Sequence, residues 1–506
     1  MQENKDRVMA VDIGTSSVRC MLFAPDGTVH ARSQIKYSTI KPQPYFEEQD
    51  PDQVRADAFA AIAECLRQPS AFPQRIAAIA FSSQMYSIFP VNVDGKPLYQ
   101  SILWSDGRAE KQAENLKSLP AAGELYRITG CPANSIYPLA KILWLRENES
   151  AVYEKAARFI SIKEYITERL TMEWAVDYSM MSATGMCDIA NHCWNEKALE
   201  LAGLSAEKLS RPVSADEVLP FKNTALLRQW NLPEDVLVFS GGGDGPLANL
   251  GSGAAEPGSV NIDLGTSGAA RVAVDKPVNG EAGGLWCYCL TQQRWTLGGI
   301  LTNVGNAYQW LCENISGFSS GAQTEAEMEK LDLEIKKHPP GADGVAFMPY
   351  LRKPRSPWWD SSLKGCIIGL RSDHNIGHIA RALFESIAFD AKIIIEAMAL
   401  HSSIKKEIVV TGGFTKNIFM TQMLSDILGR ELIVPENTEG SIAGAALIAL
   451  KGSGLTEKHA FTATAKQQTV FYPDREKTER YAKLYSNYIK TVAAFQDYWR
   501  QQEKWQ

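Results

Sequence analysis

The chain has 506 residues, of which 45% are apolar and 22% charged, and its 52 basic and 58 acidic side chains leave a net charge of −6. This length suggests two to four domains, and the composition is that of a globular protein rather than a disordered one. The mild acidity excludes an electrostatic footprint for nucleic acid or an anionic membrane.

The sequence also indicates where the protein resides. The longest small and apolar stretch, Ser441 to Leu450, is far shorter than the roughly 20 residues of a membrane-spanning helix. The N-terminus has mixed charge and leads straight into a strand-like run, so we expect no signal peptide. The nine cysteines are scattered, odd in number and without Cys-x-x-Cys spacing, which favours reduced structural thiols. We therefore expect a cytoplasmic protein.

The first informative segment is Val8 to Phe23, in which an apolar run reaches Asp12, turns through Gly14 and returns as a second apolar alternation. This pattern predicts strand, tight turn and strand. The elements expected next are a hairpin turn at Asp26-Gly27, a helix from Pro51 to Arg67 with apolar residues at helical spacing, and strands over 75–81 and 87–93.

A second segment, Ser259 to Val274, repeats the first. Its Asp-Leu-Gly-Thr-Ser block begins at Asp263, 251 residues after the Asp-Ile-Gly-Thr-Ser block that begins at Asp12, or half the chain. The period is too long for a solenoid of 20–50-residue units. We therefore expect two similar domains in tandem, 1–253 and 254–506.

The second half alternates helices and strands with short turns. We expect helices over 378–400, 417–428 and 441–451, and strands over 407–410 and 431–434. From Arg475 onward we expect a surface helix that lies back on the body of the protein. Such alternation predicts the α/β class, with a mainly parallel sheet covered by helices.

Three glycine turns are candidates for phosphate binding. The sequence has neither a P-loop nor a Gly-x-Gly-x-x-Gly after a strand. It has instead the two hydroxyl-rich turns that follow Asp12 and Asp263, and a third turn at Gly412-Gly413 that opens a helix. Backbone N–H groups in such turns can approach phosphate, and an aspartate at their head can hold Mg²⁺. The pairing favours a nucleotide held between two lobes.

A candidate general base follows the strand Val236 to Phe239. Four glycines surround Asp244 in Gly-Gly-Gly-Asp-Gly, which would leave its carboxylate uncovered at the end of a strand. His374 and His378 are four residues apart, but with no third ligand close in sequence we expect a surface or capping role for them rather than a metal site.

These motifs, in this order, resemble the FGGY carbohydrate kinases over almost the whole chain. Tyr137 to Leu145 is similar to the first family signature, and Gly365 to Glu385 to the second. The resemblance implies two actin-like, ribonuclease-H-like domains with a nucleotide and sugar cleft between them. It also implies phosphorylation of a sugar hydroxyl with ATP and Mg²⁺, and membership in a family whose enzymes are often homodimers.

By motif position, the resemblance implies a role for each of several residues. Asp244 would be the catalytic base and would also contact the sugar, and Asp12 would bind the metal and the nucleotide. The other residues expected at the nucleotide are Thr15, Ser16, Arg19, Gly265, Thr266, Gly305, Gln309, Gly413 and Asn417.

Within the family, the stretches 159–166, 176–186 and 244–251 resemble the gluconokinases. The implied reaction is D-gluconate to 6-phospho-D-gluconate, and the carboxylate of gluconate calls for a cationic partner, for which Lys163, Arg108 and Arg355 are candidates. The residues expected at the substrate are Gln84, Met85, Tyr86, Asp106, Lys163, Asp177 and Asp244.

Some positions depart from that branch. Tyr86 stands where these kinases usually have histidine, Gly107 where gluconokinases tend to have asparagine, and 352–357 lacks an expected acid. Xylulose, or another pentulose or polyol, is therefore an alternative substrate. An actin- or Hsp70-like ATPase fits less well, because the tail is too short for a peptide-binding domain and a filament subunit has no need of Asp244.

Overall fold

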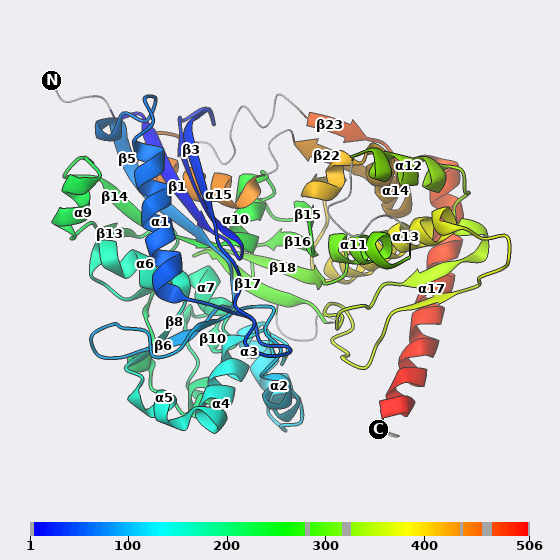
Figure 1. Cartoon of the computed structure of the whole chain (residues 1–506), viewed down its shortest axis with the longest axis horizontal. Helices are drawn as coiled ribbons and strands as arrows, with labels where there is room; N and C mark the ends of the chain where they lie inside the picture. Colours follow the sequence, from blue (N-terminus) through cyan, green and yellow to red (C-terminus); the bar gives the residue numbers. More distant parts are fainter. Residues whose placement is uncertain (1–4, 279–283, 316–324, 436–438, 458–467, 504–506) are drawn as a thin grey trace.

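The computed structural model describes residues 5–278, 284–315, 325–435, 439–457 and 468–503, without the side chains of 325–329 and 503. Two large sheets organise the molecule (Figure 1). We call the part built on the first sheet the N-terminal lobe and the part built on the second the C-terminal lobe.

The first sheet has six strands in the order β13-β14-β5-β1-β2-β3. β1 pairs in parallel with β5, and β5 with β14, whereas the other pairs are antiparallel. The strands are β1 Arg7–Ile13, β2 Ser17–Phe23, β3 Val29–Lys36, β5 Ile76–Ser83, β13 Val218–Pro220 and β14 Leu237–Gly243.

The second sheet repeats the pattern in the order β17-β18-β16-β15-β21-β22-β23. β15 is antiparallel to β16 and parallel to β21, as β1 is to β2 and β5. The predicted repeat is therefore confirmed as two sheets of like topology. The strands are β15 Val260–Leu264, β16 Gly268–Val274, β17 Trp286–Thr291, β18 Arg294–Leu301, β21 Glu407–Thr411, β22 Glu431–Pro435 and β23 Gln468–Phe471.

Alternation along β1 decides which side chains face which helix. Met9, Val11 and Ile13 pack with α1 (Pro51–Leu66) and α6 (Ile162–Thr171). Val8 and Ala10 pack on the opposite face against α15 (Gly440–Gly452), although α15 belongs to the second half of the sequence. Asp12 continues this second face and so points toward the start of α15.

Helices α10 (Asp244–Gly251) and α15 cross between the lobes (Figure 1). Their backbones touch through glycines: a Cβ on Gly251 would lie 2.0 Å from the carbonyl oxygen of Gly440, and one on Gly444 would lie 2.1 Å from that of Leu247. Since α10 begins at Asp244 and α15 begins beside Asp12, this crossing sets the spacing of the two carboxylates. The division at residue 253 stays a prediction.

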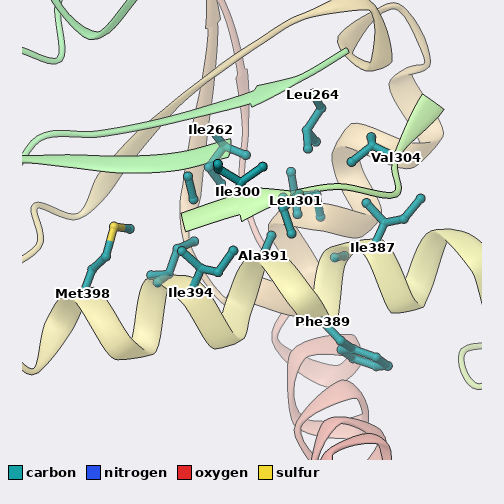
Figure 2. Packing of buried hydrophobic residues seen from close by; sticks show 14 of the residues in the cluster. Ile262, Leu264, Ile300, Leu301, Val304, Ile387, Phe389, Ala391, Ile394 and Met398 are labelled. Atoms are coloured by element: carbon teal, nitrogen blue, oxygen red, sulfur yellow. The ribbon is translucent and has the colours of Figure 1, made fainter. Parts of the chain in front are cut away.

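The C-terminal lobe is built around α13 (Ile376–Ala399). Figure 2 shows Ile387, Ala391 and Ile394 directed at sheet residues that include Ile262 and Ile300, and Phe389 directed away from that sheet. Phe389 packs on Tyr481, Tyr485 and Tyr488 of α17 (Arg475–Glu503). The tail is thus a helix that packs on the body of the protein, as predicted, and part of its aromatic face is buried there.

The remaining elements lie mostly between β5 and β14. The expected strand over 87–93 is shorter and pairs outside the main sheet, as β6 (Phe89–Val91) with β8 (Arg158–Ile160). The helices here are α2 Glu110–Lys117, α3 Ala122–Thr129, α4 Pro138–Asn148, α5 Ser150–Lys155, α7 Tyr178–Ser182, α8 Glu196–Ala202 and α9 Thr224–Gln229. The short strands are β4 Glu48–Gln49, β7 Ser101–Ile102, β9 Ala175–Asp177, β10 Cys187–Asp188, β11 Cys193–Trp194 and β12 Arg211–Val213.

The C-terminal lobe adds α11 Gly305–Asn314, α12 Glu325–Lys336, α14 Ile418–Leu428 and the pair β19 Ala346–Met348 and β20 Cys366–Ile368. Among the described helices, none has the length and apolar character that crossing a membrane would require. All nine cysteines are free thiols, as expected.

Candidate active site

The glycines around Asp244 allow the close packing that presents this residue. Gly241 has φ +66°, and a Cβ there would lie 1.8 Å from the carbonyl oxygen of Phe81. A Cβ on Gly243 would lie 2.7 Å from Met85 Cγ. Only glycine fits at position 241, and a side chain at position 243 would displace Met85. The run thus allows close packing at the end of β14 and leaves Asp244 as the first residue of α10.

The Asp244 carboxyl is half-buried, and its pKa is raised to about 7, first by burial and then by the Asp12 carboxylate. Asp263 adds to the rise, whereas Arg271 and the backbone N–H of Gly245 oppose it. A carboxyl with a pKa near neutrality is suited to accept a proton from a sugar hydroxyl.

Asp12 lies at the meeting point of the lobes. Its Oδ2 accepts a hydrogen bond from Arg19 Nη2 at 2.6 Å, and its Oδ1 is 3.3 Å from the Ser441 hydroxyl of α15. Arg19 also reaches Glu439 of the C-terminal lobe at 3.6 Å. The first turn is therefore tied by charge to the start of α15.

Asp263 holds the matching position in the second lobe, but its hydrogen bond is longer than that of Asp12 and comes from an uncharged group. It is half-buried, and the Thr411 hydroxyl donates to its Oδ1 at 3.2 Å. The turn that follows rests on α11, because the N–H of Gly305 donates to the carbonyl oxygen of Gly265 at 3.1 Å and that of Asn306 to Thr266 at 2.9 Å. Gly305 therefore lies beside the second turn, and its expected role at the nucleotide stays a prediction.

The two turns differ in the side chains they leave uncommitted. Ser16 and Thr266 are exposed. The Thr15 hydroxyl is committed, since it accepts from Trp104 Nε1 at 2.9 Å and donates to Gln84 Oε1 at 3.1 Å. Among the described residues, no hydrogen bond is recorded from the backbone N–H of Thr15 or Ser16, so the first turn offers N–H donors rather than the Thr15 side chain.

The other residues expected at the nucleotide lie on the C-terminal lobe. Gly412 has φ +95° and touches the backbone of Leu264, which places the third turn beside the second, and Gly413 is exposed with open space at its Cβ. Asn417 caps α14 through Met420 N–H and donates to Asp332 at 2.6 Å. Gln309 is exposed and bonds Glu313 at 2.7 Å.

A cluster of three tyrosines lies near Asp244, whose charge acts on Tyr86. The hydroxyl of Tyr288, from the C-terminal lobe, is 3.2 Å from that of Tyr86 and 2.9 Å from that of Tyr137. Tyr86 has φ +68°, an unusual conformation for a bulky residue. Lys141, which is fully buried, donates to the Tyr86 carbonyl at 2.8 Å and so supports this strained residue.

Arg355 is a cation without a carboxylate partner among the described residues. Its Nη2 is 3.4 Å from the Trp104 carbonyl oxygen, and its guanidinium lies 5.3 Å from the centre of the Trp104 ring. Burial lowers the pKa of the Arg355 guanidinium, and the Tyr86 side chain lies close enough to interact with its charge. Tyr86 interacts in the same way with the Asp244 carboxylate, so it lies near both charged groups.

The other expected substrate groups are already paired inside the N-terminal lobe. Lys163 and Asp177 form an ion pair in which both side chains are essentially fully buried, and Lys163 also donates to the Ser240 carbonyl at 3.0 Å. Arg108 bonds both Asp106, at 2.7 Å, and Glu48, at 2.6 Å. The structure therefore places Lys163, Asp177, Asp106 and Arg108 in closed pairs.

Several residues at this site were not predicted from the sequence. Tyr137 and Lys141 lie in the first signature stretch, which could have pointed to them. Arg271, Tyr288 and Ser441 carry no local signal, because each reaches the site from the opposite lobe or from a neighbouring strand.

Comparison with known proteins agrees with this geometry. The family model for the N-terminal domain of the FGGY family of carbohydrate kinases matches residues 7–251, and the C-terminal domain model matches residues 260–453. The chain belongs to the FGGY family of carbohydrate kinases.

One curated relative and two solved structures illustrate what this chain is similar to. This kinase is 32% identical to a gluconokinase of Bacillus subtilis over 452 residues, 88% of each chain. A gluconate kinase structure from Lactobacillus acidophilus superposes with a TM-score of 0.90 at 26% identity and covers 98% of this chain and 99% of its own. A ligand-bound xylulose kinase from the same organism gives 0.89 at 26% identity, covering 96% and 98%. The two-lobed actin-like fold is thus shared by kinases that act on different sugars.

Proposed function

We propose that this FGGY kinase transfers the γ-phosphoryl group of ATP to the C6 hydroxyl of D-gluconate. The observation that carries the proposal is the guanidinium of Arg355, which has no carboxylate partner among the described residues and lies near Tyr86, as Asp244 does. Gluconate has a carboxylate at one end and a primary hydroxyl at the other. A cation at one end of a site and a base at the other match those two groups.

The residues present fit a metal–nucleotide complex. Asp12 and Asp263 lie near the ends of equivalent strands of the two sheets, and the first turn offers backbone N–H donors that have no partner in the described part of the chain. Asp12 would hold Mg²⁺, Arg19 and Thr266 would face phosphate, and exposed Gly413 would admit the base of the nucleotide. Bound Mg²⁺ neutralises phosphate charge during transfer.

Asp244 would act on the acceptor rather than on the nucleotide. Its carboxylate would accept the proton of the C6 hydroxyl as that oxygen attacks, and Met85 and the glycine run fix its position. The Tyr86 side chain would contact the middle of the sugar chain. Because Lys141 holds the Tyr86 backbone, it would be a positioning residue.

The experiment is ADP release measured with Mg·ATP and a panel of acceptors: gluconate, xylulose, ribulose, glycerol and erythritol. The proposal expects kcat/KM for gluconate to exceed that of every neutral acceptor by at least tenfold. A neutral acceptor that equals or exceeds gluconate would overturn the assignment of gluconate and leave the kinase chemistry in place.

A pentulose or another polyol is the second candidate. The observation in its favour is the trio of Tyr86, Tyr137 and Tyr288, whose hydroxyls could bond a neutral sugar without any use of Arg355. In that case the guanidinium would serve only to stack on Trp104.

A further inference from the structure

Three of the chain's seven histidines gather at the start of α13, in the C-terminal lobe. The ring centres of His338 and His378 are 3.6 Å apart, and those of His374 and His378 are 4.6 Å apart. The Asp343 carboxylate is 3.4 Å from His378 Nε2. The spacing of His374 and His378 had offered no third ligand, but the fold supplies two from a segment more than 30 residues earlier.

The ligand-bearing atoms of His338, Asp343 and His378 all lie within 4.8 Å of one another. His338 Nε2 is buried and has no hydrogen-bond partner among the described residues. Two imidazole nitrogens and one carboxylate oxygen are a donor set that suits Zn²⁺ and its neighbours in the first transition row, and suits Mg²⁺ poorly.

We propose that His338, Asp343 and His378 form a binding site for a divalent transition-metal ion of the zinc type, with water completing the coordination. The site is separate from the kinase site and does not depend on the identity of the sugar.

The surroundings of His378 allow the proton shift that binding requires. In the metal-free protein its Nδ1 accepts from the Asn375 backbone N–H at 3.1 Å, as part of the cap of α13. A metal at Nε2 requires the proton on Nδ1, where Asn375 Oδ1 lies 3.0 Å away to accept it. The capping role expected for His378 is therefore confirmed and is compatible with a ligand role.

His374 lacks a comparable acceptor for a proton on Nδ1, so it is not part of the proposed site. Its Nδ1 accepts from the Arg371 N–H at 3.1 Å, and no second acceptor is recorded for it among the described residues. Its proton therefore stays on Nε2, which cannot then bind a metal.

The segment that carries His338 and Asp343 is held in place by α13. Arg381, which is buried, donates to the His338 carbonyl at 2.7 Å, and Glu385 accepts from the Gly341 N–H at 3.0 Å. Arg381 and Glu385 also pair with each other at 2.9 Å. A preorganised backbone lowers the cost of assembling the ligands, and a bound ion would cross-link this segment to α13.

The test uses the full-length protein stripped with EDTA and titrated with ZnCl₂ by calorimetry. Wild type is expected to bind one equivalent. Asp343→Asn is expected to weaken binding by at least tenfold, and because asparagine tolerates the positive φ of +52° the backbone is retained. His338→Gln should do the same. The matched control is His401→Gln at an exposed histidine outside the cluster, which should bind like wild type.

Thermal unfolding supplies the second measurement. Zn²⁺ should raise the Tm of wild type and of the His401→Gln protein, but not that of Asp343→Asn. The proposal is overturned if wild type takes up no Zn²⁺ at millimolar concentration, or if Asp343→Asn binds with unchanged stoichiometry and affinity. Equal weakening by His401→Gln would overturn it as well, since binding would then be non-specific.

Discussion

Two regions of the molecule carry charged residues that the sequence motifs mark equally, but the residues of one region are paired with opposite charges and those of the other are not. Lys163 and Asp177 are sealed in an ion pair with almost no exposure. Asp244 and, from the other lobe, Arg355 have no partner of opposite charge within hydrogen-bonding distance among the described residues. We call the first the closed region and the second the open region.

The contrast separates charges that stabilise the fold from charges that are free to bind a ligand. A buried pair whose hydrogen bonds are satisfied gains little from a substrate, because the substrate would first have to break it. An uncommitted buried charge is unfavourable until a ligand arrives, which is the usual condition of a group at a binding site. The predictions below test that division, from the largest expected effect to the smallest.

Asp244→Asn, in the open region, should abolish most of the phosphoryl transfer to the sugar. We expect kcat to fall by about 10²–10⁴-fold while ATP still binds, since the amide cannot accept the hydroxyl proton. Steady-state ADP release and calorimetric ATP binding check this. A fall of less than tenfold would remove Asp244 from the role of base.

Lys163→Met should act on the closed region and therefore on folding. Removal of the ammonium leaves Asp177 buried without its counter-charge, which typically costs about 3–5 kcal/mol. Urea unfolding measures this loss. A stable variant with a raised KM for gluconate would instead place Lys163 at the substrate.

The pH dependence should report the raised pKa of Asp244. Because the base must be deprotonated, kcat/KM should fall about tenfold per pH unit below a pKa of about 7 and level off above it. Burial raises this pKa, so the folded protein binds the extra proton between the ordinary value of the carboxyl and about 7, and Asp244 costs stability above that range.

The same linkage can be measured as stability. Asp244→Asn should raise the Tm at pH 8, where the wild-type carboxylate is charged, and change it little at pH 4, where it is neutral. An equal change at both pH values would argue against a buried carboxylate as the cause.

Thr15→Val and Thr266→Val extend the comparison to the repeated turns, where one threonine is hydrogen-bonded and the other is exposed. The Thr15 hydroxyl is bonded to Gln84 and Trp104, so its loss should cost about 1–3 kcal/mol of folding stability. Thr266 is exposed, so its loss should leave stability unchanged and raise only the KM for ATP. Unfolding curves measure the loss of stability, and ATP titrations measure the change in affinity. Equal losses of stability in the two variants would contradict the claim that only the Thr15 hydroxyl is committed to the fold.

The sequence predicted the fold well because its signals are local. The turns after Asp12 and Asp263 each lie between two strands that pair directly, so pattern alone reveals them. The position of α15 on the N-terminal sheet was not predictable, since it depends on glycine contacts with α10 that are remote in sequence.

The candidate site was predictable only in part. Asp244 has a glycine run to mark it, but a motif cannot distinguish a cation that is already paired from one that is not. Lys163 and Arg355 were therefore equal candidates until their partners could be seen. Tyr288 was missed because it contacts Tyr86 across more than 200 residues of sequence.

The most direct test of the account is a comparison of Arg355→Met with Arg352→Met, an exposed arginine of the same segment, on gluconate and on xylulose. The account predicts that Arg355→Met raises the KM for gluconate at least tenfold and leaves that for xylulose unchanged, and that Arg352→Met changes neither. Equal effects of Arg355→Met on both acceptors, or none on gluconate, would contradict the claim that this arginine recognises the substrate carboxylate.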